Sequence, residues 1–262
     1  MLQKIIIKGK CSATGTVKGY GGTEIHGWFF KMLEEINPEL SARIHGMDEK
    51  PFSIGPVYGG KKEKGKTVFE EGEEYSFTFA SLNEEIFKVV SNMAFTLVGN
   101  KIYLGTAGLN ITEVRPIFGS KGLSFYDILE KHSLVNREIT LQFSSSTSFR
   151  QQGTQEIFPQ PDLVFGSLLR KWNAFSPVSL PGELGNSPIL VKKYNLKTEL
   201  VDFGKYKVIG CIGNSTYQLD KSLPNFQVNM LNSLAFFAGI AGIGYKTSMG
   251  LGDARYLYDD RR

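Results

Sequence analysis

Histidine side chains are the first candidates for chemistry in this sequence, because an imidazole ring gains and loses a proton near neutral pH. The chain has three histidines. His45 stands directly before Gly46, at the expected end of a short helix, where the partial negative charge of the last carbonyls favours a protonated ring. This position suits a general acid, which donates a proton to a leaving group.

His26 and Lys50 lie in the same part of the sequence. His26 is near the start of the first expected helix and at the edge of its apolar face, where the ring could act as a base. Lys50 follows His45 in a loop, where its charge could stabilise a negative charge that develops during a reaction. A base, an acid and a cation are the groups that metal-independent cleavage of RNA requires. A lone histidine on a helix is more often a packed or surface residue, so this interpretation needs support from other parts of the chain.

Other kinds of catalysis lack the residues that they need. Cys11 and Cys211 are far apart, and no cluster of cysteine and histidine has the spacing of a zinc site. No motif of an acyl-transfer triad is present, and paired carboxylates occur only in polar runs such as Glu34 and Glu35. We therefore expect no bound metal and no small-molecule cofactor.

A stretch near the end of the chain, GIGYKTSMGLG, is rich in glycine: Gly242, Gly244, Gly250 and Gly252. It does not fit a phosphate-binding loop, because Tyr245 interrupts the pattern and the apolar helical run comes before the glycines instead of after them. It does not fit the dinucleotide-binding pattern either, since Thr247 occupies the place of the third glycine. Two interpretations remain, a turn into a last strand and a backbone cradle for a polyanion.

The composition indicates a globular protein without a membrane partner. Its 262 residues, 41% of them hydrophobic, suffice for one large domain or two of ordinary size. The net charge of +4 is too small to indicate a nucleic-acid partner by itself. The first ten residues hold too short an apolar run for a signal peptide, and no stretch approaches the roughly 18 apolar residues of a membrane span. We therefore expect a cytoplasmic protein.

Apolar periodicity predicts alternating strands and helices in the first half of the chain. Asn37 and Pro38 should begin a short helix that ends at Gly46, and Ser81 with Glu84 should form a capping box. The expected elements are a strand at 2–9, helices from 23 and from 38, strands at 52–58 and 75–82 around a lysine-rich tip, a helix after the capping box with Ile86, Val90, Met93 and Leu97 on one face, and a strand region at 101–114.

The second half of the chain repeats this order. After a short helix, its expected elements are a strand at 137–143, a helix at 161–173, strands at 188–202 and 206–217, a helix at 225–240, and a last strand at 255–258. Strand, helix, strand, strand, helix, strand is the ferredoxin-like order. The sequence therefore predicts an α+β protein of two tandem ferredoxin-like (βαββαβ) domains, 1–118 and 119–262, with a C-terminal glycine-rich loop.

Three stretches together resemble a known family, the CRISPR-associated repeat-processing endoribonucleases, or Cas-six family, of the repeat-associated mysterious protein (RAMP) superfamily. The glycine-rich stretch has the family's spacing of Gly, apolar, Gly, five residues, Gly, apolar, Gly. The stretch IHGWFFKMLEEINPELSARIHGMDEKPFSIGPV is similar to the region that contains the family's catalytic histidine. The stretch LQFSSSTSFRQQGTQEIFPQPDLVFGSLLRKWNAFSP is similar to the opening of the family's second half.

The resemblance implies a reaction and residues that perform it. The family cleaves CRISPR precursor RNA within its repeats without a metal, by 2′-hydroxyl attack, and leaves 2′,3′-cyclic phosphate and 5′-hydroxyl ends on the way to guide RNAs for antiviral defence. His45 matches the family's catalytic histidine, Lys50 falls near a lysine that assists in some members, and His26 matches a site that is histidine in some members. Phe30 stands where the family often has a tyrosine, so a hydroxyl that could share proton transfer is missing. Which histidine is acid and which is base stays open.

The resemblance also implies partners. Repeat RNA would contact the glycine-rich stretch and Arg150, while Arg43 is either a contact or a solvated side chain. Tyr245 either stacks on a base or packs against the loop. Other subunits of a CRISPR effector complex are further candidate partners, and the alternative function is a non-catalytic RNA-binding subunit of such a complex. The expected RNA-binding residues are Gly242, Gly244, Tyr245, Lys246, Gly250, Gly252, Arg150 and Arg43.

Overall fold

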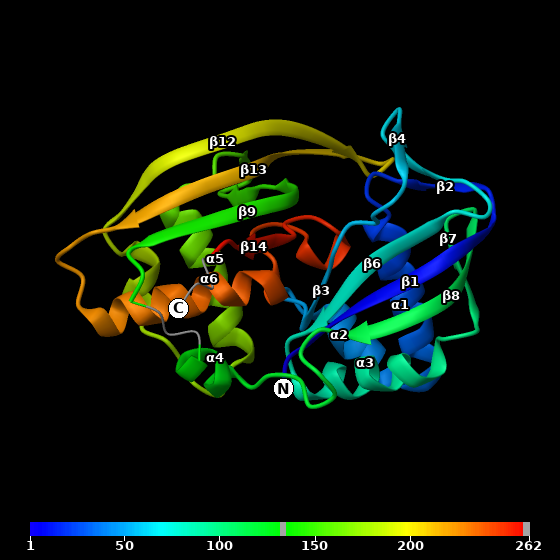
Figure 1. Ribbon diagram of the computed structural model, residues 1–262, viewed down its shortest axis with the longest axis horizontal. Coiled ribbons are helices and arrows are strands. Elements are labelled where there is room, and N and C mark those ends of the chain that lie inside the picture. The colour runs from blue at the N-terminus through cyan, green and yellow to red at the C-terminus, as the bar shows by residue number, and fades with distance from the viewer. Residues whose placement is uncertain (132–134, 259–262) are drawn as a thin grey trace. The chain divides into compact units, whose positions relative to one another are not determined.

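The structure is a computed structural model of the chain and describes residues 1–131 and 135–258. The chain forms a mixed fold of helices and strands that divides into two compact units (Figure 1). Unit 1 contains 1–122, 200–208 and 248–251, and unit 2 contains 123–199, 209–247 and the residues from 252 onward. Short pieces from the second half of the chain therefore belong to unit 1.

Unit 1 is built around a five-stranded sheet whose paired strands are antiparallel. The strands lie in the order β3 (Phe52–Ile54), β6 (Glu74–Ser81), β1 (Gln3–Ala13), β8 (Ala107–Pro116) and β7 (Lys101–Leu104). The helices are α1 (Gly22–Ile36), α2 (Pro38–Gly46) and α3 (Glu84–Thr96). The predicted order of strand, helix, strand, strand, helix, strand is found in β1, α1, β3, β6, α3 and β8.

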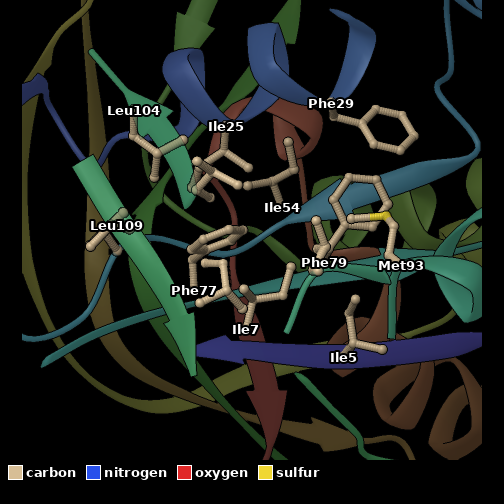
Figure 2. Close-up of a cluster of buried hydrophobic side chains, with 14 of the residues drawn as sticks. Ile5, Ile7, Ile25, Phe29, Ile54, Phe77, Phe79, Met93, Leu104 and Leu109 are labelled. Atoms are coloured by element: carbon tan, nitrogen blue, oxygen red, sulfur yellow. The ribbon is translucent and has the colours of Figure 1, made fainter. Parts of the chain in front are cut away.

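The core of unit 1 forms because the apolar side chains of strands and helices face the same side of this sheet (Figure 2). Ile5 and Ile7, two positions apart on β1, are both buried on one face, as the strand period requires. Ile25 and Phe29 of α1 are fully buried against them. This packing fixes α1 on the sheet and thereby fixes which way its other face points.

Asn37 joins α1 to α2 as the sequence predicted. Its backbone N–H donates to Leu33 at the end of α1, and its side-chain oxygen accepts a bond of 3.0 Å from the N–H of Leu40 in α2. Pro38 occupies the first turn of α2, where no backbone donor is needed. The chain therefore turns sharply between the helices, and α1 and α2 pack against each other.

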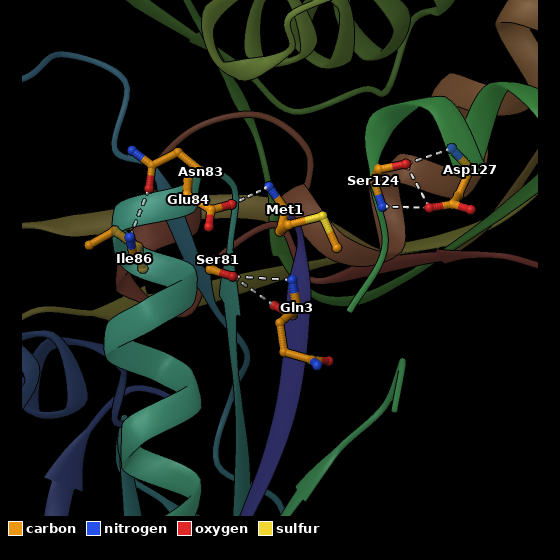
Figure 3. A network of polar contacts seen from close by, with 8 residues as sticks. All are labelled: Met1, Gln3, Ser81, Asn83, Glu84, Ile86, Ser124 and Asp127. Carbon is orange, nitrogen blue, oxygen red and sulfur yellow. Dashed lines mark hydrogen bonds and ion pairs between the residues drawn. The ribbon is translucent and has the colours of Figure 1, made fainter. Parts of the chain in front are cut away.

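The predicted capping box at Ser81 and Glu84 is wrong. Ser81 is the last residue of β6, and its Oγ accepts a bond of 3.1 Å from the backbone N–H of Gln3 on β1 (Figure 3). Asn83 caps α3 instead, because its side-chain oxygen accepts a bond of 2.9 Å from the N–H of Ile86 (Figure 3). The carboxylate of Glu84 lies 3.3 Å from the amino terminus.

The lysine-rich tip contains strands of its own, which the sequence did not predict. The tip contributes β4 (Lys61–Glu63) and β5 (Lys66–Phe69), which join β2 (Gly15–Lys18) in a second, three-stranded sheet in the order β2, β5, β4. The apolar side chains Val17 and Phe69 anchor this sheet because both are buried in the core of unit 1.

Unit 2 has a four-stranded sheet in the order β12 (Ile189–Asp202), β13 (Lys207–Leu219), β9 (Glu138–Thr147) and β14 (Ala254–Tyr256). Its predicted element order is found in β9, α5 (Pro161–Phe175), β12, β13, α6 (Asn225–Ala241) and β14. Trp172 of α5 and Phe237 of α6 meet edge to face at a ring-centroid distance of 5.3 Å. The remaining elements are α4 (Phe125–Lys131), β10 (Phe149–Gln151), β11 (Thr154–Glu156), η1 (Gly182–Asn186) and η2 (Thr247–Met249).

Candidate active site

His45 lies in the last turn of α2 and is exposed to solvent. Its ring packs edge-on against Phe30 of α1, with 5.2 Å between the ring centroids and 89° between the planes. The predicted position at the carbonyl end of a short helix is therefore confirmed.

His26 packs against the same phenylalanine. Its ring centroid lies 4.7 Å from that of Phe30 and 5.9 Å from that of Phe52 on β3. Residues 26 and 30 are neighbours on one face of α1 because they are four positions apart. The structure therefore brings His26 and His45, predicted from different helices, onto one aromatic side chain.

The half-buried ring of His26 is oriented by a backbone carbonyl. Its Nδ1 lies 3.0 Å from the carbonyl oxygen of Ser248. A carbonyl oxygen can only accept a hydrogen bond, so the contact places the proton on Nδ1. In the neutral ring Nε2 is then the basic nitrogen.

Lys50 contacts the backbone of the helix that carries His45. Its Nζ donates a bond of 2.8 Å to the carbonyl oxygen of His45 and a second bond to that of Met47. Burial lowers the pKa of Lys50 from its ordinary value, and the Asp48 carboxylate opposes this shift. The ammonium group thus fixes the carbonyl end of α2, a contact that the sequence did not predict.

The glycine-rich segment, 242–252, is held mainly by hydrogen bonds from its backbone N–H groups to acceptors outside the segment. The N–H groups of Gly242, Ile243, Gly244, Tyr245 and Gly252 all donate to acceptors within the protein. A Cβ on Gly244 would lie 2.3 Å from the carbonyl oxygen of Ser148, and one on Gly252 would lie 2.0 Å from that of Ile243. These two glycines are needed because backbone packs against backbone. The same five N–H groups are therefore not available as the cradle for a polyanion that the sequence suggested.

The side chains of Tyr245 and Lys246 in this segment form a cluster with Arg150 of β10. The guanidinium carbon of Arg150 lies 5.6 Å from the Tyr245 ring centroid, and its Nη1 donates a bond of 3.3 Å to the Tyr245 hydroxyl. The Nζ of Lys246 lies 5.0 Å from the same ring centroid. Two cations and one aromatic ring, all at least partly exposed, are thus grouped in unit 2.

The comparisons with known proteins point to one family. A family model described as CRISPR-associated endoribonuclease Cas6 matches residues 141–254. A Cas6 endoribonuclease of Streptococcus thermophilus is 20% identical over 238 residues, which cover 87% of this chain and 88% of that protein. A solved Thermus thermophilus Cas6, in a product complex, is 25% identical with a TM-score of 0.80, and the match covers 98% of this chain and 100% of that one. The resemblance to the Cas6 family is confirmed.

Two further comparisons differ in extent. A Cas6 endoribonuclease of Mycobacterium tuberculosis is 28% identical over 124 residues, so the match spans 45% of this chain and only 38% of that relative. The structure of a Cas6-related protein from Pyrococcus furiosus is 13% identical with a TM-score of 0.66, covering 99% of this chain and 100% of that one. At that identity the second match shows the Cas6-like fold alone.

Arg43, the last of the candidate RNA-binding residues, forms an ion pair within unit 1. Its Nη2 donates a bond of 2.6 Å to a carboxylate oxygen of Glu85 on α3, and both side chains are exposed. The guanidinium group is thus engaged in a surface ion pair, which is worth little to stability.

Lys171 was not predicted, although it supports the glycine-rich segment directly. This lysine of α5 is only 3% exposed. Its Nζ donates bonds of 2.9 Å to the carbonyl oxygen of Ala241 and 2.6 Å to Thr247 Oγ1, and lies 3.4 Å from the carbonyl oxygen of Gly242. The ammonium group therefore ties both ends of the stretch 241–247 together. The sequence gives no signal of this, because lysine on an amphipathic helix is usually solvated.

Among the residues described, no group of three or more His, Cys, Asp or Glu side chains could hold a metal ion. In the same part of the chain, no helix has the length and apolar character to cross a membrane.

Proposed function

We propose that this protein is an endoribonuclease that cleaves CRISPR precursor RNA within its repeats. The observation that carries the proposal is the pair of imidazole rings on Phe30, with His45 exposed at a helix end and His26 oriented by a backbone carbonyl. We also infer that each unit is a ferredoxin-like half, because both sheets have the same strand order. In each, the four strands of the predicted element order lie side by side as second, third, first and fourth.

Each histidine has a distinct role in the proposed reaction. Nε2 of neutral His26 takes the proton of the ribose 2′-hydroxyl, and the 2′-oxygen forms a bond to the adjacent phosphorus. His45, at the end of α2, acts as the acid and gives its proton to the 5′-oxygen as the bond from phosphorus to that oxygen breaks. The products are a 2′,3′-cyclic phosphate and a 5′-hydroxyl, and no metal takes part.

Lys50 acts in this proposal through the backbone. Its bonds to the carbonyl oxygens of His45 and Met47 hold the end of α2 and therefore hold the position of the His45 ring. The same ammonium group adds positive charge near the phosphate that is attacked.

RNA binding is assigned to the Arg150, Tyr245 and Lys246 cluster. A guanidinium and an ammonium group suit phosphate oxygens, and the tyrosine face suits a stacked base. Gly242, Gly244, Gly250 and Gly252 contribute by letting the segment keep its compact course. CRISPR repeat RNA is the proposed partner, and the solved relatives described as product and substrate-mimic complexes support this choice.

A second candidate function is an RNA-binding subunit that does not cut. Phe30 favours it, because the residue that touches both imidazole rings has no hydroxyl to pass a proton. This alternative predicts tight binding of repeat RNA that stays intact.

The deciding experiment incubates the protein with its own repeat RNA in EDTA. We expect cleavage to a 2′,3′-cyclic phosphate, and no cleavage of RNA with a single 2′-deoxy group at the scissile ribose. His45→Ala should slow cutting about a hundredfold or more while RNA affinity stays nearly unchanged. Glu39→Ala, an exposed change on the same helix, is the matched control. Intact RNA in EDTA that is cut once magnesium is added would refute the proposal.

A further inference from the structure

We propose that residues 248–251 of the glycine-rich segment position the base His26, and that Gly22 of α1 is the residue that makes this possible. The inference rests on the proposed function and adds a task for one part of a segment otherwise assigned to RNA binding. It concerns only contacts within unit 1, to which both α1 and 248–251 belong.

The segment runs along one face of α1. A Cβ on Gly22 would lie 2.1 Å from the carbonyl oxygen of Met249 and 2.6 Å from the N–H nitrogen of Gly250. One helical turn further on, His26 Nδ1 lies 3.0 Å from the carbonyl oxygen of Ser248. Residues 22, 26 and 30 are successive i, i+4 neighbours, so one stripe of the helix carries the docked backbone, the imidazole and then Phe30.

Gly22 and Gly250 allow the backbone of 248–251 to pack closely against α1, whereas Gly27 of the same helix is not needed for this contact. Gly250 has a φ of 83°, and a Cβ on it would lie 3.0 Å from the Cα of Gly22. Any side chain on Gly22 would push the backbone of 248–251 away, because less than 3.0 Å separates its Cβ position from three backbone atoms. Gly27, on the same helix, has no atom within 4 Å of its Cβ position. The requirement for glycine is therefore specific to the face that carries His26.

The docked carbonyl determines what His26 can do. With Nδ1 donating to Ser248, the neutral ring presents Nε2 as its basic nitrogen. If the backbone moves away, the ring can exchange tautomers and rotate, and the fraction of rings with a correctly placed basic nitrogen falls. Groups that orient a metal-ligating histidine are typically worth about 10- to 100-fold in activity, and we expect an effect of the same order here. Because the contact does not involve RNA, substrate affinity should be spared.

The test combines a tautomer measurement with cleavage rates. In protein labelled with ¹⁵N-histidine, at a pH where the ring is neutral, we expect His26 to show a protonated Nδ1 and an unprotonated Nε2. Gly22→Ala should lose this signature and slow single-turnover cutting at least about tenfold, with the Kd for RNA unchanged. Gly27→Ala should keep both the signature and the rate.

The outcomes separate this inference from the proposed function. A wild-type His26 with its proton on Nε2 would overturn the inference, whether or not Gly22→Ala folds. Equal cutting by Gly22→Ala and Gly27→Ala would also overturn it, while cleavage by the wild type would leave the function intact. If the wild type binds but never cuts repeat RNA, the proposed function fails, and the spectrum still decides whether 248–251 orient the ring.

Discussion

Replacing Lys171 with methionine tests how the glycine-rich segment keeps its shape. Methionine has a similar length and an apolar body, so the packing within α5 should survive while the ammonium group is lost. The change removes bonds to Ala241 and Thr247, at 2.9 Å and 2.6 Å, and a longer contact of 3.4 Å to Gly242. All of these acceptors lie at the two ends of the stretch 241–247.

The expected cost follows from the two short bonds. Hydrogen bonds to a charged group contribute about 1.5–3 kcal/mol each, and the buried acceptors would lose their partner. Part of this is returned, because a buried ammonium group no longer has to be desolvated. We expect the free energy of opening the segment to fall by about 2–3 kcal/mol.

Hydrogen exchange measures this opening locally. The N–H of Ile243 donates to the carbonyl oxygen of Gly252 within the segment, and the N–H of Tyr245 donates to that of Ser148 outside it, so the exchange of both reports the opening of the segment. A loss of about 2–3 kcal/mol should speed their exchange roughly 30- to 150-fold. Arg170→Met, which removes an exposed charge from the next position of the helix, is the control and should leave both rates unchanged. Unaltered exchange in Lys171→Met would refute a supporting role for the buried ammonium group.

Three further predictions test single contacts. Arg150→Met should weaken RNA binding and reduce its salt dependence by about one phosphate contact, and an unchanged salt slope in binding titrations would exclude that contact. Asn83→Ala should lower the free energy of unfolding by about 0.5–2 kcal/mol in denaturation experiments, as loss of the α3 cap requires. Lys131 and Ser124 hold the pKa of Asp127 well below its usual range, so its stabilising effect is complete above the unfolded pKa near 4 and is lost as pH falls through the folded pKa. Asp127→Asn should remove that acid-dependent part, which comparison of denaturation at pH 6 and pH 2 would detect.

Local patterns in the sequence predicted the helices of unit 1 well. The apolar period of α1, Asn37 as the junction and His45 at the end of α2 depend on neighbours within a few positions, and all three were found. The error at Ser81 has a local cause as well. Its hydroxyl fits a capping box, but β6 extends to this residue and uses the hydroxyl across the sheet, which leaves Asn83 as the cap.

Contacts between distant positions could not be predicted in this way. The carbonyl of Ser248 that faces His26 lies 222 positions away along the chain. Backbone carbonyls carry no sequence signal, so nothing in the residue type of Ser248 marks it as a partner. Lys171 is similar, because its burial depends on where α5 and α6 meet, and a one-dimensional period does not give that position. Gly22 does carry a sequence signal, because it follows a second glycine, Gly21. That signal indicates a turn, however, and not a contact with the backbone of 248–251.

The symmetric spacing of the glycines has two physical causes instead of one. Gly242, Gly244 and Gly252 permit close packing of the backbone within unit 2, in the same part of the segment as Tyr245 and Lys246. Gly250 permits close packing in unit 1, beside Gly22 and the carbonyl that orients His26. A single continuous segment therefore serves the proposed RNA contacts and the proposed base through different residues. Changes at Tyr245 or Lys246 should alter affinity, because these residues carry the proposed RNA contacts, whereas changes at 248–251 should alter the rate of the chemical step, because the carbonyl of Ser248 orients His26.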